Sequence, residues 1–237
     1  MDPHLCDVAL QHEWESSVSD ANLLSEFTVV EQVTNRLGRI SPFDFVLALL
    51  LLIFFAPIML TVALMVYLQD GGPVFFAHRR LGYGGETFPC LKFRSMAVDA
   101  EARLERLLEQ SPEARAEWAQ DHKLKNDPRI TPLGAFLRRS SLDELPQLFN
   151  VLRGEMRFVG PRPIVQGEVA RYGRRFRNYC SVRPGITGLW QVSGRNDLSY
   201  RRRVAIDTLY SRVRNGRLDL KILVMTLPAV LLKRGSY

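Results

Sequence analysis

Residues 45–68 form a run of twenty-four residues with no charged side chain, and Pro57 lies almost at the centre of this run. At about 1.5 Å per residue, a helix of this length is long enough to cross the hydrocarbon core of a membrane. Pro57 lacks a backbone N–H and crowds the carbonyl of Ile53, which predicts a bend or a break in mid-helix. The run therefore predicts either a kinked spanning helix, the commoner object, or a re-entrant helix that turns at Ala56-Pro57 and leaves on the side it entered.

Basic residues on both sides of the run bear on that choice. Arg36 and Arg39 precede the run, and Arg79 and Arg80 follow it. Because a spanning helix usually carries its Lys and Arg on the cytoplasmic flank, two basic flanks favour a hairpin with both ends on the cytoplasmic side. A cleavable signal peptide is not expected, since the run starts deep in the chain and is longer than the apolar core of a signal.

Local signals mark the start and the end of the predicted membrane helix. Ser41 can cap the helix, Pro42 suits its first position, and Asp44 stands where a capping box places its acid. This cap is sufficient to account for Asp44. Beyond the run, the Gly-Gly-Pro sequence at residues 71–73 must end the helix.

Charge is distributed unevenly along the chain. Residues 1–35 contain seven acids and no Lys or Arg, which is typical of a poorly ordered tail, so the remaining residues carry a formal charge of +14. A basic body of this size indicates anionic partners, namely phospholipid head groups, phosphorylated substrates or nucleic acid. No nucleic-acid-binding motif accompanies the charge, so nucleic acid is not expected as a partner.

Downstream of the run, the residue patterns predict one domain of modest size. Residues 74–76 and 88–93 predict two short strands joined by a glycine-rich turn, and residues 99–120 predict a charged amphipathic helix interrupted near Ser111-Pro112. Residues 218–232 predict an amphipathic segment in the membrane interface. That segment is too short, and too interrupted by charges and Pro228, to cross a membrane.

Residues 141–152 predict a helix with an apolar stripe at positions 145, 148, 149 and 152. Asp143 and Glu144 fall in its first turn on either of two registers. Ser141 caps the helix through a Ser-x-x-Glu capping box, or Asp143 caps it and so accommodates Pro146 in the first turn. On general grounds such a pair of acids is structural, because carboxylates stabilise a helix N-terminus.

The surrounding arginines favour a functional interpretation of the two acids. Arg138 precedes them, and Arg162 follows between two prolines that fix its backbone, which suits bidentate binding of a phosphate. Two carboxylates beside such arginines can hold Mg²⁺ against phosphate oxygens. With Mg²⁺ and the arginines lowering its pKa, Asp143 is expected to stay ionised and to attack phosphorus.

Five motifs in a fixed order carry a resemblance to a known family. They are LKFRSM at residues 91–96, RITPLG at 129–134, SSLDELPQLFNVL at 140–152, FVGPRP at 158–163 and RPGITG at 183–188. Together they closely resemble the bacterial sugar transferases known as monotopic polyprenyl-phosphate phosphoglycosyl transferases. The resemblance runs from about Arg39 to Tyr237, so that only the acidic tail lies outside it.

The resemblance implies a reaction and assigns residues to it. The family transfers a sugar-1-phosphate from a UDP-sugar to undecaprenyl phosphate, releases UMP and initiates surface polysaccharide synthesis. Its Asp-Glu dyad matches Asp143, the implied nucleophile that forms a phosphosugar-aspartyl intermediate, and Glu144, which helps to hold Mg²⁺. The residues implied to bind phosphate or substrate are Arg138, Arg162, Lys92 and Arg183.

The resemblance also implies a topology, and it reverses the general preference for a spanning helix. Members of the family carry a re-entrant helix broken at a Ser-Pro pair, whereas this chain has Ala56-Pro57 and lacks that hydroxyl. The implied fold is helix-rich α/β, with an acidic tail (residues 1–35), a re-entrant membrane helix broken at Pro57 (36–70) and a small cytoplasmic catalytic domain with interfacial amphipathic helices (71–237). The implied location is the cytoplasmic face of the bacterial inner membrane, in contact with phospholipids, and a homodimer is a further expectation.

Residues 188–196 and 207–210 most resemble members that move hexose-1-phosphate for exopolysaccharide or O-antigen assembly, which makes galactose or glucose the expected sugar. Two other functions stay open at this point. A membrane glycosyltransferase would release UDP instead of UMP. A membrane-tethered basic protein would bind anions without turning them over.

Overall fold

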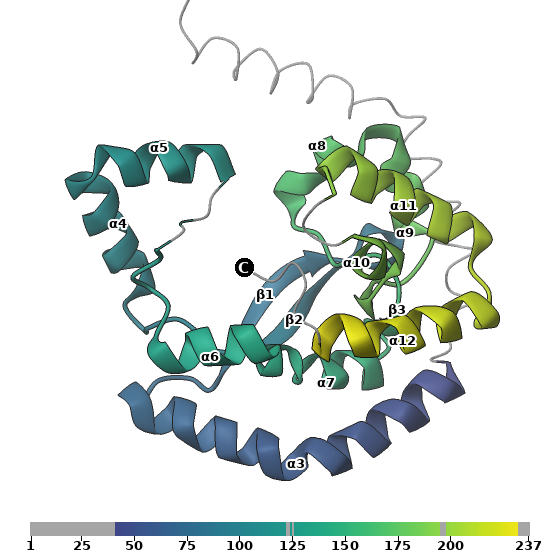
Figure 1. Ribbon diagram of the computed structural model, residues 1–237, viewed down its shortest axis with the longest axis horizontal. Helices are drawn as coiled ribbons and strands as arrows, with labels where there is room; N and C mark the ends of the chain where they lie inside the picture. The colour runs from purple at the N-terminus through teal and green to yellow at the C-terminus, as the bar shows by residue number, and fades with distance from the viewer. Residues whose placement is uncertain (1–40, 122–123, 125, 195–197, 232–237) are drawn as a thin grey trace, which may run out of the picture. The chain divides into compact units, whose positions relative to one another are not determined.

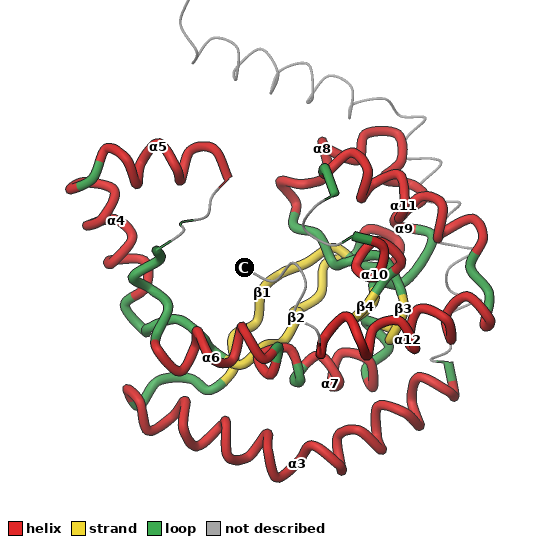
Figure 2. The backbone as a smooth tube through the Cα atoms, viewed as in Figure 1, coloured by secondary structure: helices red, strands yellow, loops and turns green. Residues whose placement is uncertain are grey.

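The computed structural model describes residues 41–121, 124, 126–194 and 198–231 of the chain, and Ile40–Tyr237 form one compact unit. The predicted acidic tail and the basic residues Arg36 and Arg39 lie outside the described residues. The described helices and strands, in chain order, are α3 (Pro42–Asp70), β1 (Phe75–Leu81), β2 (Thr87–Phe93), α4 (Ala100–Gln110), α5 (Pro112–Asp121), α6 (Pro132–Ser140), α7 (Gln147–Leu152), β3 (Arg157–Val159), α8 (Val169–Tyr172), α9 (Phe176–Cys180), β4 (Gly185–Thr187), α10 (Leu189–Ser193), α11 (Tyr200–Val213) and α12 (Gly216–Leu231). The predicted mixture of many helices and little sheet is confirmed (Figure 2).

The helix α3 begins and ends where the local signals predict. The Ser41 hydroxyl accepts a hydrogen bond from the backbone N–H of Asp44 at 3.5 Å, and Pro42 occupies the first turn. At the other end Gly71 adopts a left-handed conformation with φ 67°, and its N–H donates to the Tyr67 carbonyl at 2.8 Å. A glycine takes this conformation without steric strain, which allows the chain to leave the helix.

The helix α3 bends near its middle, and its backbone stays helical through Pro57 (Figure 1). The Thr61 hydroxyl donates to the Pro57 carbonyl at 2.9 Å. A threonine that bonds to the carbonyl four residues earlier often bends a helix, and this bond adds to the effect of the missing N–H of Pro57. The structure therefore has the predicted bend without an interruption of the helix, and Thr61 supplies a hydroxyl near the bend, where Ala56 has none.

One face of α3 packs against the rest of the protein, and the other face is exposed and apolar. The packed face consists mainly of Ala48, Met59, Val62 and Val66. Among the described residues α3 is the one helix that is long and apolar enough to cross a membrane, and 17 % of its most apolar window is buried. A helix from the core of a water-soluble protein would be buried over most of its length.

The helix α12 is also apolar on its exposed side. Ile222 is completely buried in the core, whereas Leu220, Val224 and Leu227 are exposed. This alternation confirms the amphipathic pattern predicted for residues 218–232 as far as Pro228, the last residue of the helix whose side-chain exposure is described.

The strands β1 and β2 form the predicted antiparallel hairpin. In its register Phe76 pairs with Lys92 and Arg80 pairs with Phe88, so Arg80 and Lys92 lie on the same face of the hairpin. The predicted charged helix is also found, as α4 and α5, and the interruption falls at Ser111 as expected.

The strands β3 and β4 pair in parallel and bring two of the sequence motifs together. Gly160 follows β3 and Gly185 begins β4, and a Cβ atom on Gly185 would lie 2.1 Å from the Gly160 backbone nitrogen. The glycines therefore allow the two backbones to touch. As a consequence the FVGPRP segment, which contains Arg162, is fixed against the RPGITG segment.

Candidate active site

Asp143 and Glu144 lie in a short 3₁₀ turn, Leu142–Glu144, between α6 and α7. Ser141 ends α6 with a left-handed backbone (φ 59°), and its side chain makes no capping hydrogen bond within the described structure. The helix α7 begins only after Pro146. Both predicted caps, through Ser141 and through Asp143, are therefore wrong: Ser141 is used to turn the chain out of α6, and the two acids precede α7 by one turn.

Lys92 on β2 connects the two carboxylates. Its Nζ lies 2.6 Å from Glu144 Oε1 and 3.8 Å from Asp143 Oδ2. The Asp143 side chain is 9 % exposed, whereas the Glu144 side chain is partly open to solvent. The site thus contains one buried carboxylate, one accessible carboxylate and an ammonium group that bridges them.

The pKa values of the two carboxyl groups are shifted in opposite directions from their ordinary values. Burial raises the pKa of Asp143 to about 6, and the negative charge of Glu144 adds to the rise, while the charges of Lys92 and Arg138 oppose it. Partial burial also disfavours the charged form of Glu144, but the charge and the hydrogen bond of Lys92 hold its pKa below the usual value. The neighbouring cations therefore lower the pKa of Asp143 as predicted, but burial, which the sequence did not reveal, outweighs them, and the predicted contribution of Mg²⁺ stays a prediction. A carboxyl group of pKa about 6 is still mostly ionised at neutral pH, and its oxygen is more basic than that of an ordinary aspartate.

A cavity of about 80 Å³ opens beside Lys92 and Glu144. Two arginines, Arg80 and Arg162, line it together with these residues. The Arg80 Nη1 donates to the Pro163 carbonyl at 3.2 Å and lies 3.9 Å from Glu168 Oε2. Three cationic side chains therefore face a cavity with one carboxylate, which is an arrangement that binds anionic oxygens. The remaining lining residues are Cys90, Gln147, Pro163, Gly185, Ile186 and Gln191.

Arg80 is the main site residue that the sequence analysis missed. There it served only as one of the basic residues flanking the apolar run. The signal that could have found it is the alternation along β1, because Arg80 and Lys92 share one face of the hairpin. Burial and the charge of Arg162 lower the pKa of the Arg80 guanidinium, which reflects the crowding of positive charge around the cavity.

Two predicted residues lie at the margin of this arrangement. The Arg138 Nε donates to Ser95 Oγ at 2.9 Å, and its charge acts on Asp143 from the end of α6. The Arg183 guanidinium lies over the Tyr83 ring, 5.2 Å from its centroid. Arg183 is not among the residues that line the cavity, although Gly185 of the same motif is.

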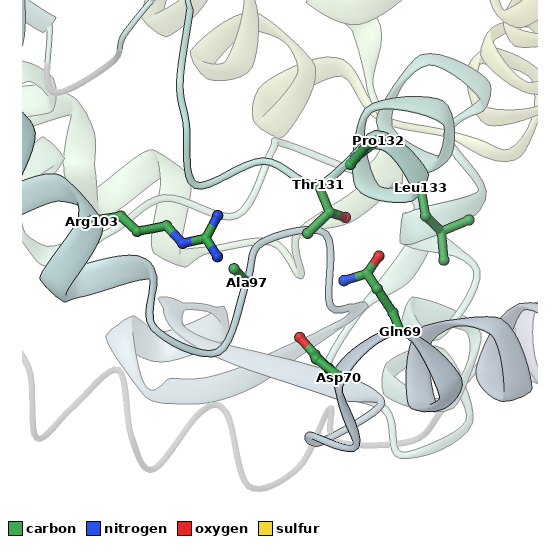
Figure 3. Close-up of a pocket in the computed structure, with 7 residues that line it drawn as sticks. All are labelled: Gln69, Asp70, Ala97, Arg103, Thr131, Pro132 and Leu133. Atoms are coloured by element: carbon green, nitrogen blue, oxygen red, sulfur yellow. The ribbon is translucent and has the colours of Figure 1, made fainter.

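A larger cavity, of about 440 Å³, lies elsewhere, at the C-terminal end of α3. Figure 3 shows Gln69 and Asp70 facing Ala97 and Thr131 across it. Its lining contains none of the residues that the sequence predicts to bind phosphate or to react. The smaller cavity is therefore the candidate active site, because it contains the chemically suitable groups.

The dyad fits Mg²⁺ in one particular way. No group of three or more metal-ligating side chains occurs among the described residues, so they form no closed metal cage. Mg²⁺ usually binds to one or two carboxylates and completes its shell with water and substrate phosphate. Asp143 and Glu144 supply that number of carboxylates beside a cavity suited to phosphate, so the residues present fit an ion that arrives with a diphosphate substrate.

Comparisons with known proteins identify the family of this chain. The family model "Bacterial sugar transferase" matches residues 35–233, and the chain therefore belongs to the bacterial sugar transferase family. The exopolysaccharide production protein ExoY of Rhizobium meliloti is 51 % identical over 197 residues, which cover 82 % of this chain and 86 % of that protein. The undecaprenyl-phosphate galactose phosphotransferase of Salmonella typhimurium is 51 % identical over 223 residues, or 91 % of this chain and 46 % of that protein.

A third relative carries glucose in its name. The UDP-glucose:undecaprenyl-phosphate glucose-1-phosphate transferase of Xanthomonas campestris is 40 % identical over 202 residues, which cover 82 % of this chain and 39 % of that protein. The chain thus spans less than half the length of the Salmonella and Xanthomonas relatives. It spans most of the length of ExoY.

Proposed function

We propose that this protein transfers a hexose-1-phosphate from a UDP-sugar to undecaprenyl phosphate and releases UMP. The observation that carries the proposal is the buried Asp143 beside Glu144, Lys92 and a cavity lined by Arg80 and Arg162. A diphosphate placed there would have three cations around its oxygens. Asp143 does not itself line the cavity, but its carboxylate lies 3.8 Å from Lys92, which does. The names of the relatives in Salmonella and Xanthomonas support the lipid acceptor.

The reaction takes place in two displacements at phosphorus. An oxygen of ionised Asp143 attacks the phosphorus that bears the sugar, and the bond to the bridging oxygen breaks, so that its electron pair leaves with UMP. An oxygen of undecaprenyl phosphate then attacks the same phosphorus, and the carboxylate of Asp143 leaves. One cavity can serve both steps, because the leaving group of the first step and the nucleophile of the second are both phosphates.

The cations of the site have separate tasks in this scheme. Lys92 lies closest to the dyad and can neutralise charge that develops at the reacting phosphate. Arg80 and Arg162 line the same cavity and hold the non-reacting phosphate oxygens. Bound Mg²⁺, for which Glu144 is the proposed ligand, would withdraw charge from the phosphate oxygens.

The exposed apolar surfaces of α3 and α12 support a place at the membrane, where the acceptor resides. We propose a re-entrant α3 at the cytoplasmic face of the bacterial inner membrane, with phospholipids against its exposed residues and the active site at the depth of the head groups. Galactose and glucose are the proposed sugars, since both occur in the names of relatives.

One assay separates this function from its two alternatives. Purified protein is incubated with Mg²⁺, undecaprenyl phosphate and labelled UDP-galactose or UDP-glucose, and the nucleotide product is identified. UMP is the expected product. UDP would instead indicate a glycosyltransferase, and the absence of turnover with every UDP-sugar would favour a membrane-tethered binding protein.

A further inference from the structure

Two ion pairs tie the ends of α3 to the rest of the protein. At the N-terminal end Asp44 is 3 % exposed, and its Oδ2 accepts a hydrogen bond from Arg157 Nε at 2.7 Å. At the C-terminal end Asp70 Oδ1 accepts from Arg94 Nη2, and the same nitrogen donates to the Val66 carbonyl at 3.2 Å. Asp44 is therefore more than part of a helix cap, because its carboxylate bonds to a residue 113 positions away.

Each of the two arginines lies close in sequence to a cation of the active site. Arg94 follows Lys92 by two residues, directly after β2, and its backbone N–H donates to the Val74 carbonyl at 2.9 Å. Arg157 begins β3, which leads through the close contact of Gly160 with β4 to Arg162. Each end of α3 is therefore paired with an arginine that lies only a few residues from a cation of the cavity.

The strand β3, which connects Arg157 to the segment with Arg162, is also held in place by hydrogen bonds. The Phe158 N–H donates to Asp44 Oδ1 at 3.4 Å. The Tyr210 hydroxyl donates to the Val159 carbonyl at 3.1 Å and lies 2.8 Å from Asp219 Oδ1, and Asp219 in turn lies 3.8 Å from Arg157. The network therefore fixes β3 from both sides.

The packed face of α3 consists mainly of apolar side chains, among them Phe55. Their contacts are less directional than an ion pair, so the two carboxylates add directional contacts that the packing lacks. One member of each pair is buried, Asp44 and Arg94, whereas Asp70 and Arg157 are partly open to solvent. Ion pairs of this kind add little net stability, but they can specify one arrangement among several. Asp44 and Asp70 are suited to that task, since they hold the two ends of one helix to two different segments of the site.

We propose that Asp44 and Asp70 are positioning residues that set the depth of the phosphate-binding cations relative to the membrane helix. The inference rests on the proposed function, in which one cavity serves a soluble donor and a membrane-bound acceptor. The acceptor phosphate is held at the depth of the head groups, whereas the UDP-sugar diffuses freely to the cavity. Loosening either end of α3 therefore impairs the step with the lipid and leaves the step with the donor intact.

The test measures the two steps separately in Asp44→Asn and Asp70→Asn. The first step is the burst of UMP released without acceptor, and the second is transfer to undecaprenyl phosphate in phospholipid vesicles. A water-soluble, short-chain prenyl phosphate replaces the vesicle-borne acceptor in a parallel series. Asp99→Asn serves as the matched control, since Asp99 pairs with Arg103 at 2.8 Å on the exposed surface of α4.

Both variants are expected to raise the KM for the vesicle-borne acceptor by about tenfold to a hundredfold, while the UMP burst and the KM for the soluble acceptor change by less than about twofold. The control is expected to match the wild type. Equal losses in both steps, unchanged transfer to vesicles, or loss of folding in both variants would overturn the proposal. Failure of the wild type to release UMP would instead refute the proposed function.

Discussion

Asp207 gives a quantitative prediction of how stability depends on pH. It lies on α11 and is 2 % exposed. Its Oδ2 accepts a hydrogen bond from the Tyr172 hydroxyl at 2.9 Å, and its Oδ1 has no hydrogen-bond partner within the described part of the chain. Burial raises the pKa of Asp207 from its ordinary value of 3.8 to about 7, against the opposing effect of the Tyr172 hydrogen bond.

The sign and the size of the effect follow from this shift. Because the folded protein binds the proton of Asp207 more tightly than the unfolded chain, the free energy of unfolding falls as the pH rises from about 4 to about 7. Each pKa unit corresponds to about 1.4 kcal/mol, so the ionised group lowers the free energy of unfolding by about 4 kcal/mol above this range. About 3 kcal/mol of that loss falls between pH 5 and pH 8.

The perturbation is Asp207→Asn, which keeps the size and the acceptor for Tyr172 and removes the titration. The amide nitrogen is left without a partner, which costs about 1–3 kcal/mol at every pH. We expect the stability of the variant relative to the wild type to improve by about 3 kcal/mol between pH 5 and pH 8. Unfolding of both proteins in detergent, at several pH values, measures this difference. A difference that stays constant over the range would refute the reasoning.

Two further predictions concern the site and the membrane helix. Arg80→Ala is expected to raise the KM for the UDP-sugar by about tenfold to a hundredfold, because a charge-assisted hydrogen bond contributes about 1.5–3 kcal/mol. The control Arg79→Ala, at an exposed position of β1, is expected to leave this KM unchanged. Steady-state kinetics measures both variants, and equal effects would contradict the assignment of Arg80. Cysteines at the exposed positions Phe43 and Gln69 are expected to react with an impermeant thiol reagent from the cytoplasmic side only, as a re-entrant α3 requires; labelling from opposite sides would establish a spanning helix.

Much of the fold follows from local signals in the sequence. The ends of α3 were predictable because Ser41 and Gly71, which flank the helix, act within one turn of its ends. The hairpin and the interruption at Ser111 are likewise specified by nearby glycine and proline residues. That Asp143 and Glu144 lie together follows from their adjacency in the chain, whereas Lys92, which contacts both, lies 52 positions before Glu144.

The features that were missed depend on contacts between distant residues. Nothing near Asp44 in the sequence points to Arg157, 113 positions away. The burial that raises the pKa of Asp143 was missed, because nearby cations can be read from the sequence but the burial that outweighs them cannot. Arg80 shares a face of the hairpin with Lys92, but the other side of its cavity is formed by Arg162 and Pro163, and the Pro163 carbonyl that Arg80 contacts lies 83 positions later.

In the proposed reaction Asp143 forms a covalent bond to the sugar phosphate. Mass spectrometry of the intact protein, after incubation with Mg²⁺ and UDP-galactose or UDP-glucose in the absence of lipid acceptor, tests it most directly. The expected result is a mass increase of one hexose phosphate, located on the peptide that contains Asp143. The increase should be absent from Asp143→Asn and should disappear when undecaprenyl phosphate is added. Full turnover to the lipid product by Asp143→Asn, or release of UDP without any protein adduct, would contradict the claim.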